Sequence, residues 1–364
     1  MQLTRYAYLD GIRGIAALFV VARHSNLMLG MATYRSHLAV DLFFLLSGFV
    51  IAHAYEARLR TGAISFKDFV RIRIIRLYPV YLVSVVFAVA VALAALGAVQ
   101  GKLNGGTLAE VSAASVLTLF FLPSSLSWSD YLFPLNSVYW SLFFELAVNF
   151  IYALALSRLT DGVLKAVALV AALVCAVLAL RTGTLDHGFM FNVQSVVGGL
   201  ARSAFGFSVG VLFYRNREKL AALMTGRFWP AAGMVTITAV LASPSIPGLN
   251  GVIELLCIFV LIPIAVLGLA FQQPRAAVIE RTMTFLGNAS YPLYVLHGPM
   301  VFLTYRAVKR LGPQFMFPAG VAMVAGLIAA AVILERWFDP PVRRWINARW
   351  AVRRGTAQIT PASR

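Results

Sequence analysis

Residues 77–99 read LYPVYLVSVVFAVAVALAALGAV, a run of 23 residues without a charged side chain. A helix of about 20 apolar residues crosses roughly 30 Å of hydrocarbon, so this run is long enough to span a bilayer. Similar runs recur along the chain, which is 60% hydrophobic and only 12% charged. A soluble domain carries about 25% charged residues, so this chain lacks the charge to cover a water-facing surface. We therefore expect an all-α polytopic membrane protein.

The apolar runs predict about ten transmembrane helices. They lie near 7–29, 38–55, 77–99, 137–157, 163–181, 196–215, 228–244, 250–271, 286–309 and 315–338. The run 111–123 is too short to cross and predicts a re-entrant or surface helix. Basic residues gather in 58–76, in 215–227 and near the C-terminus, and an even number of spans places all of them on one side. Both termini are therefore expected in the cytosol, and the protein in a bacterial inner membrane.

The chain is expected to form one transmembrane domain over residues 1–340, followed by a loose basic cytosolic tail over 341–364. Its net charge of +17 is spread over loops and this tail, as expected beside anionic lipid. No folded basic surface with interleaved aromatic residues is visible, which argues against nucleic-acid binding. Cys175 and Cys257 each lie inside an apolar run, so we expect small core residues without a disulfide or a metal site.

The first predicted span carries charged side chains, which are costly in lipid and mark functional candidates. Arg13 and His24 are eleven residues apart, about 16 Å along a helix, and three turns bring them to nearly the same face. Arg13 is expected near the cytosolic mouth and His24 deep, toward the far side. His24 is the best candidate for acid–base chemistry, whereas His297 is equally well interpreted as a hydrogen-bonded core histidine.

Two carboxylates near the starts of later spans are further candidates. Asp41 is expected at about the depth of His24, where it either orients the imidazole or caps its own helix; both interpretations stay open. Glu145 lies among apolar residues and has to be protonated or paired. His37 and His187, near span ends or in loops, are expected to be solvated or interfacial.

A basic loop leads into the third span. Arg73 and Arg76 are spaced i, i+3, which places them on one helix face as a fork suited to phosphates. Anchoring at the lipid surface explains any basic loop, and the residues by themselves favour that interpretation. Gly14 and Gly48 predict close packing between helices.

Taken together, these motifs resemble the membrane acyltransferase family 3, which includes bacterial O-antigen and exopolysaccharide acetylases. Residues 9–14 (LDGIRG) with His24 resemble the family's Arg-(ten residues)-His motif, and residues 43–48 (FFLLSG) its Phe-Phe-x-x-Ser-Gly element. Residues 73–76 (RIIR), followed by Tyr78, resemble its Arg-x-x-Arg element. Later stretches that fit the family are 140–145 and 290–297. The matches fall in the family's order and cover most of the chain.

The resemblance implies a ten-helix fold that brings a cytosolic acyl-CoA, with acetyl-CoA as the default, to an extracytoplasmic carbohydrate acceptor. It also implies that the arginine fork contacts CoA phosphates, with no metal involved. The catalytic candidates are then His24, Asp41 and Glu145. The CoA-binding candidates are Arg13, Arg73, Arg76, Tyr78 and Ser47.

The expected reaction is O-acetylation, or transfer of another short acyl group, and it has two versions. In one, His24 is a general base oriented by Asp41 or Glu145; in the other, His24 is transiently acylated. The competing class is a transporter or exporter whose intramembrane charges line a solute path, but no internal repeat supports it. Membrane lipid is the expected surrounding partner, and the residues leave open whether a partner protein or a second copy assembles with the chain.

Overall fold

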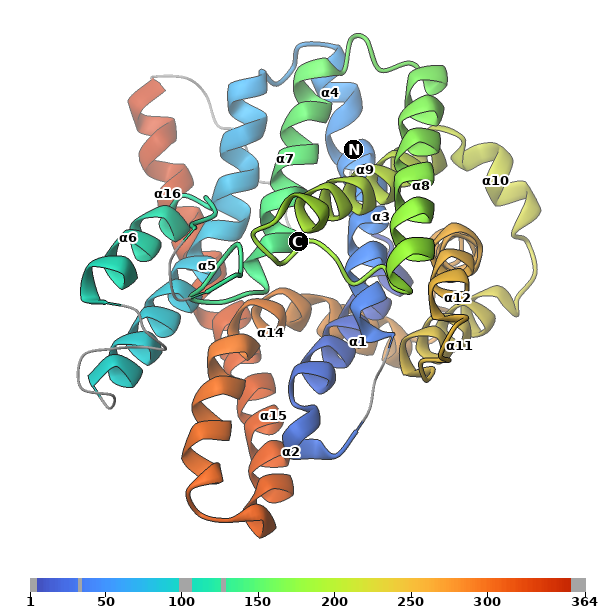
Figure 1. Ribbon diagram of the computed structural model, residues 1–364. Coiled ribbons are helices and arrows are strands. Elements are labelled where there is room, and N and C mark those ends of the chain that lie inside the picture. The colour runs from blue at the N-terminus through green and yellow to red at the C-terminus, as the bar shows by residue number, and fades with distance from the viewer. Residues whose placement is uncertain (1–4, 32–34, 98–106, 126–128, 355–364) are drawn as a thin grey trace.

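The computed structural model describes residues 5–31, 35–97, 107–125 and 129–354 (Figure 1). Within these ranges the fold is helical, and its isolated β-bridge joins Tyr131 to Met190. The long helices are α1 (Ala7–His24), α3 (Ala39–Ile51), α5 (Phe66–Gly97), α6 (Leu108–Leu119), α7 (Tyr139–Ala155), α8 (Asp161–Thr182), α9 (Val193–Arg215), α11 (Trp229–Ala242), α14 (Ala277–Lys309), α15 (Met316–Ile333) and α16 (Asp339–Arg354). The shorter ones are α2 (Asn26–Leu29), η1 (Ser36–Leu38), η2 (Ala52–Glu56), α4 (Ala57–Arg60), α10 (Arg217–Leu223), α12 (Asn250–Leu256), η3 (Cys257–Leu261), α13 (Ile262–Ala270), η4 (Pro313–Phe315) and η5 (Leu334–Phe338).

Six helical stretches in the described residues are long and apolar enough to cross a membrane. They are Ser36–Arg60, Phe66–Leu96, Asp161–Thr182, Val193–Arg215, Asn250–Ala270 and Pro313–Trp350. Each of the ten predicted spans coincides with a helix, but α7 and α11 are shorter, and α1 and α14 carry charges. The number of ten crossings and the side of the termini therefore stay predictions.

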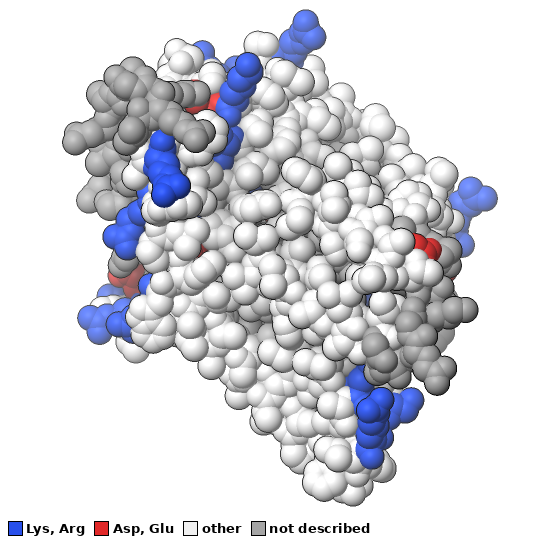
Figure 2. Space-filling view, turned by 90° about the vertical axis from the view of Figure 1, so that its left-hand side faces the viewer, with Lys and Arg blue, Asp and Glu red and all other residues white. Residues whose placement is uncertain are grey.

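The exposed surface fits a lipid environment. Large apolar side chains such as Val86, Leu169, Leu180 and Val235 are more than half exposed on their helices. Figure 2 shows Lys and Arg at the margins of one face, with a broad surface free of charge between them. In water such a surface would cost free energy, whereas hydrocarbon accepts it.

Several helix boundaries differ from the predicted ones. Phe66 begins α5, so Arg73 and Arg76 lie on helical turns and not in a loop. The predicted loose tail is helical up to Arg354, where α16 ends, and residues 355–364 lie outside the described residues. The run 111–123 forms the twelve-residue α6, too short to span, and Thr107 caps its first turn.

Glycines bring the central helices together. α1 packs along α14, and a Cβ at Gly14 would lie 2.3 Å from the backbone oxygen of Leu286. α3 packs along α9, and a Cβ at Gly48 would lie 2.1 Å from the backbone oxygen of Phe207. Real Cβ atoms do not approach so closely, so the predicted role of both glycines in close packing is confirmed. The α1–α14 contact is what brings Arg13 and His24 against the later half of the chain.

Candidate active site

Two cavities lie at opposite ends of α1. The cavity at the end predicted to face the cytosol, here called the inner cavity, has a volume of about 150 Å³ and is lined by Arg13 near the start of the helix. The outer cavity, of about 900 Å³, is lined by His24 at its end. Eleven residues of helix rise about 16 Å, so α1 joins two separate sites. The spacing predicted from the Arg-(ten residues)-His motif thus corresponds to two chambers and not to one.

The inner cavity gathers most of the predicted CoA-binding residues. Arg13, Ser47, Arg73 and Arg76 all line it, together with Glu145. The NH2 of Arg73 donates to Oε1 of Glu145 over 2.9 Å, and the Ser47 hydroxyl donates to the same oxygen over 3.0 Å. Glu145 is therefore paired, one of the two states that its apolar position allowed. It is at this cavity, and not beside His24.

The other two arginines of the inner cavity are also held by protein groups. Arg13 donates from Nε to the Ser290 hydroxyl over 3.0 Å and from NH2 to the backbone oxygen of Gly287 over 3.2 Å, both on α14. Arg76 pairs with the buried Asp339 over 3.3 Å. The three guanidinium groups are thus oriented before any ligand arrives, which lowers the entropy lost on binding an anion.

Tyr78 does not belong to this cavity. Its ring packs against the rings of Tyr81 and Phe121, with centroid distances of 6.4 and 6.2 Å, and the residue is absent from the cavity lining. Arg73, Arg76 and Tyr78 share one helix, but two residues beyond Arg76 the helix has turned its side chain to another face. Its position therefore argues against the expected CoA contact.

Asp41 pairs with Arg202 and not with His24. The guanidinium of Arg202 donates from Nε and NH2 to the two carboxylate oxygens over 2.9 and 2.6 Å, and both residues are buried. The same guanidinium donates to the backbone oxygens of His37 and His187 and lies over the ring of Trp140. Of the two roles left open for Asp41, a contact with His24 is therefore not formed, because α3 directs the carboxylate toward α9.

The side chain that meets His24 is another histidine. Nε2 of His297 lies 3.2 Å from Nδ1 of His24, and the rings are 4.8 Å apart. Nδ1 of His24 is also 3.0 Å from the backbone oxygen of Val20. His297 is fully buried, whereas His24 is exposed to the outer cavity. The sequence left the role of His297 open, and the structure assigns it a place in the site.

The outer cavity has two different walls. One wall is apolar and comes from α5 and α14, with Ala88, Val91, Ala92, Val301 and Phe302. The other is polar and comes from the segment before α7, with Ser129, Asp130, Tyr131, Asn136 and Ser137. Hydroxyl, amide and carboxylate groups beside an aromatic ring suit a ligand rich in hydroxyl groups.

A proline in α14 leaves a backbone oxygen free to hydrogen-bond this polar segment. Pro299 has no N–H, so the backbone oxygen of Val295, four residues earlier, lacks its helical partner. That oxygen accepts from the Asn136 amide over 2.9 Å and from the Ser84 hydroxyl over 2.5 Å. One carbonyl therefore ties α14 to α5 and to the cavity wall.

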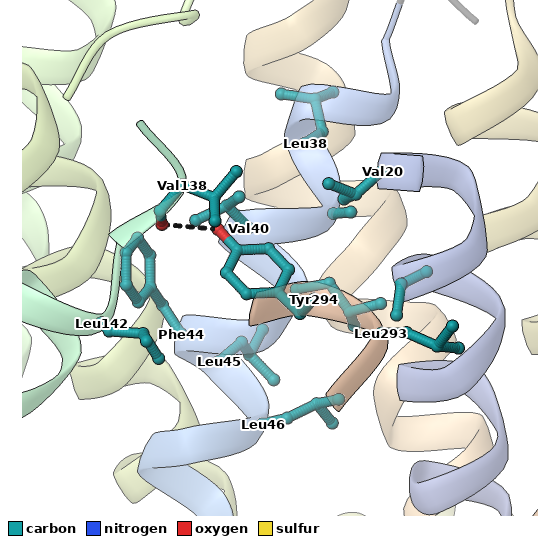
Figure 3. Packing of buried hydrophobic residues seen from close by; sticks show 14 of the residues in the cluster. Val20, Leu38, Val40, Phe44, Leu45, Leu46, Val138, Leu142, Leu293 and Tyr294 are labelled. Atoms are coloured by element: carbon teal, nitrogen blue, oxygen red, sulfur yellow. Dashed lines mark hydrogen bonds between the residues drawn. The ribbon is translucent and has the colours of Figure 1, made fainter. Parts of the chain in front are cut away.

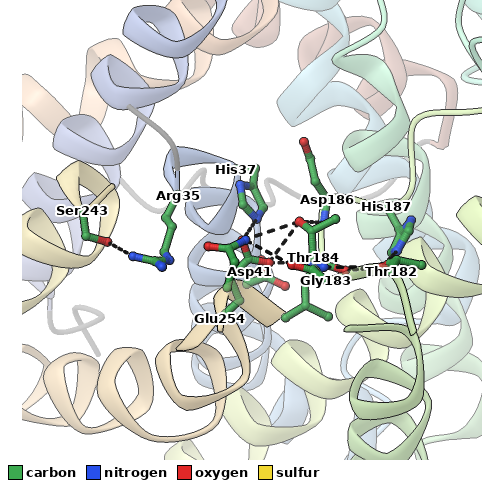
Figure 4. Close-up of polar contacts among 12 residues, drawn as sticks. Arg35, His37, Asp41, Thr182, Gly183, Thr184, Asp186, His187, Ser243 and Glu254 are labelled. Atoms are coloured by element: carbon green, nitrogen blue, oxygen red, sulfur yellow. Dashed lines mark hydrogen bonds and ion pairs between the residues drawn. The ribbon is translucent and has the colours of Figure 1, made fainter. Parts of the chain in front are cut away.

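A buried polar cluster holds the loop between α8 and α9 against the outer cavity (Figure 4). Glu254 accepts from the backbone N–H of Leu185 over 2.6 Å and lies 3.3 Å from His37. His37 is buried, contrary to the solvated position expected from the sequence. Arg23, beside His24, pairs with Asp186 of the same loop over 2.5 Å. Burial alone would raise the pKa of Asp186, but the nearby His37 and Arg23 side chains outweigh burial and place that pKa below its usual value.

Apolar side chains pack around Tyr294 at the edge of the inner cavity. Tyr294 lines the inner cavity, and its hydroxyl lies 2.6 Å from the Ser141 hydroxyl and donates to the backbone oxygen of Val138 over 3.2 Å. Figure 3 shows its ring surrounded by apolar side chains of α1, α3, α7 and α14, among them Val40, Phe44 and Leu142. The ring of Tyr294 lies 5.8 Å from that of His297, so it stands between the inner cavity and the histidine pair.

A family model described as an acyltransferase domain matches residues 6–336. The chain belongs to the membrane acyltransferase family 3. It is 43% identical to "Protein 2 in picA locus" of Rhizobium radiobacter over 159 residues, which are 41% of this chain and 81% of the relative. It is 25% identical to the exopolysaccharide production protein ExoZ of Rhizobium meliloti over 316 residues, 84% of this chain and 89% of the relative. No solved structure matches the chain significantly.

For an acyltransferase, the arrangement offers a cationic pocket and a separate base. The inner cavity supplies three oriented guanidinium groups, and the outer cavity supplies an exposed imidazole. Among the described residues, no group of three or more His, Cys, Asp or Glu side chains could hold a metal ion. The family match makes the lining of the two cavities, with His24 in the outer one, the candidate site of acyl transfer.

Proposed function

We propose that this acyltransferase moves an acetyl or other short acyl group from cytosolic acyl-CoA to a hydroxyl of an extracytoplasmic carbohydrate. It would do so in the bacterial inner membrane, with about ten crossings and both termini in the cytosol. The observation that carries the proposal is the pair of cavities joined by α1, with arginines at one end and a histidine at the other. The name of one relative, an exopolysaccharide production protein, supports a polysaccharide acceptor.

The donor would bind at the inner cavity. Arg13, Arg73 and Arg76 carry charge that complements the phosphates of CoA, and guanidinium groups bind phosphate oxygens through paired hydrogen bonds. Nε of Arg73 is buried without a hydrogen-bond partner among the described residues, so it has a donor to spare. A cavity of about 150 Å³ is too small for a whole nucleotide. The phosphates would lie at its mouth, and the thioester arm would enter.

The transfer would take place at His24. Nε2 of the imidazole takes the proton of the acceptor hydroxyl, and the oxygen bonds to the thioester carbonyl carbon. The carbon–sulfur bond then breaks, and the imidazolium returns the proton to the thiolate of CoA. On its way to His24 the thioester would pass the Tyr294 ring, which lies between the inner cavity and His297.

A covalent version uses the same residue. Nε2 of His24 attacks the thioester carbonyl carbon, the carbon–sulfur bond breaks, and CoA leaves as the thiolate. The acceptor oxygen then takes the acyl group from the imidazole, and the proton of the acceptor hydroxyl stays on Nε2 until it passes to solvent. Direct transfer predicts that both substrates bind before either product leaves. The covalent version predicts ping-pong kinetics and an acyl-enzyme that forms without acceptor.

The test compares surface glycans by mass spectrometry in a deletion strain. The strain is complemented with the wild-type protein, with His24→Ala, or with His53→Ala as a histidine control away from both cavities. The expected result is an acyl mass on a glycan with the wild type and the control, and its absence with a membrane-inserted His24→Ala. Full acylation by His24→Ala would overturn the role of His24, and no glycan change with the wild type would overturn the substrate class.

A further inference from the structure

The contacts of His24 determine which of its nitrogens carries the hydrogen. Nδ1 lies 3.0 Å from the backbone oxygen of Val20, and a carbonyl oxygen can only accept. Nδ1 of His24 must therefore be the donor in this contact. The neutral ring has one N–H, so Nε2 is left with a lone pair, and this is the nitrogen without a partner among the described residues.

The contact with His297 follows from the same hydrogen. Nε2 of His297 lies 3.2 Å from Nδ1 of His24, which already carries the hydrogen. Nε2 of His297 has to present its lone pair, because a second hydrogen between the two nitrogens would clash. Nδ1 of His297 then carries the hydrogen of that ring and donates to the backbone oxygen of Leu293 over 3.2 Å. The two carbonyl contacts, of Val20 with His24 and of Leu293 with His297, are therefore both satisfied when each ring carries its hydrogen on Nδ1.

We propose that His297 is a positioning residue that, as the second acceptor beside the Val20 carbonyl, helps to hold His24 as its Nδ1–H tautomer and so leaves Nε2 as the basic atom. This inference rests on the proposed function for its catalytic meaning. In many acid–base sites a carboxylate fills this place. Here Asp41 and Glu145 are paired with Arg202 and Arg73, so neither is the partner of His24.

The position of His297 suits such a role. The residue is fully buried. Two residues before it in α14, the backbone oxygen of Val295 accepts hydrogen bonds from Asn136 and Ser84. A ring held in this way keeps the His24 imidazole at a constant angle toward the outer cavity. During transfer, Nδ1–H of the His24 imidazolium still faces two acceptors, the Val20 oxygen and Nε2 of His297. The proton gained at Nε2 then passes to the CoA thiolate.

The first test is spectroscopic and does not need turnover. Protein labelled with ¹⁵N-histidine is reconstituted into liposomes, and the signals of His24 are assigned by their loss in His24→Gln. We expect the wild type to show a protonated Nδ1 and an unprotonated Nε2. His297→Phe leaves the Val20 oxygen as the remaining acceptor and should lower the share of the Nδ1–H form, whereas His297→Gln, whose Oε1 can accept in place of Nε2, should keep the wild-type share. A wild-type His24 protonated at Nε2 would overturn the proposal whatever the protein catalyses.

The second test is kinetic. In His297→Phe we expect kcat for acyl transfer to fall at least tenfold with KM for acyl-CoA unchanged, and His297→Gln to recover most of kcat. Diethyl pyrocarbonate, which acylates an unprotonated imidazole nitrogen, should label His24 faster in the wild type and in His297→Gln than in His297→Phe. Equal kcat and equal labelling in all three proteins would overturn the positioning role. If the tautomer is as expected but His24→Ala still transfers acyl groups, the role of His24 in the transfer fails and the assignment of the tautomer stands; if the wild type transfers no acyl group, the proposed function fails.

Discussion

The inner and outer cavities differ in how each supports its polar groups. In the inner cavity every arginine has a protein partner, either a carboxylate or a hydroxyl and a backbone oxygen. In the outer cavity the partners of His24 are the His297 imidazole and the backbone oxygen of Val20, neither of which is a carboxylate. Paired cations are suited to holding an anion in place, whereas an imidazole without a charged partner can gain and lose a proton. In the proposed function, binding and chemistry are therefore divided between the two ends of α1.

The largest effect is expected from His24→Ala assayed in proteoliposomes. Loss of a general base lowers kcat by about 10²- to 10⁴-fold. Affinity for acyl-CoA, measured by calorimetry, should stay within twofold, because the inner cavity is untouched. An equal loss of acyl-CoA affinity would show that the two cavities do not work separately.

The next largest effect concerns stability at the outer end. Arg202→Leu leaves the buried Asp41 without its partner and should cost about 3–5 kcal/mol of folding free energy. A thermal unfolding assay in detergent should show the lower Tm. Addition of Asp41→Asn should restore part of it, since the unpaired charge is then gone. If Asp41→Asn alone abolishes transfer in a protein of normal Tm, Asp41 has a catalytic role after all.

At the inner end, Arg73→Ala should raise KM for acyl-CoA by about ten- to hundredfold. A hydrogen bond to a charged group is worth about 1.5–3 kcal/mol, and the change also leaves Glu145 unpaired. Arg73→Lys should lose less, and Arg281→Ala, an exposed arginine of α14, serves as the control. The KM for the acceptor should not change. An unaltered KM for acyl-CoA would place donor binding elsewhere.

The smallest effect is expected at the polar wall of the outer cavity. Tyr131→Ala should raise KM for the carbohydrate acceptor by about two- to tenfold, because one aromatic contact is worth about 0.5–1.5 kcal/mol. KM for acyl-CoA should remain at the wild-type value. A selective effect on acyl-CoA would reverse the assignment of the two cavities.

Helix positions and the polar anchors of the site were predictable to different degrees. The apolar runs located the ten predicted spans, because hydrocarbon demands a continuous apolar stretch, and Gly14 and Gly48 marked two close helix contacts. The basic α16 was expected as a loose tail. Arg13, Ser47, Arg73 and Arg76 were recognised by motif and do line one cavity. The sequence did not predict that α5 begins at Phe66, because a stretch rich in arginine can be either a basic loop or the polar first turns of a helix.

The pairings were less predictable because they join residues far apart in the chain. The partner of Asp41 lies 161 residues away, and that of His24 lies 273 residues away. A sequence gives the depth of a side chain in a span but not which neighbouring helix it faces. Arg202 lies inside an apolar helix, and a charge in such a position needs a buried partner. The sequence alone therefore contained a signal for Arg202 as a candidate residue.

Pro299 lowers the stability of α14 but supports the wall of the outer cavity. Replacing it with alanine would return an N–H to α14 and favour the helix by about 3 kcal/mol in intrinsic propensity. The repaired turn would, however, compete with Asn136 and Ser84 for the Val295 oxygen and loosen the wall of the outer cavity. A selection for heat tolerance alone would favour alanine at this position, whereas a selection for turnover would retain proline. The imperfection in the helix is thus what an engineer of this enzyme should leave in place.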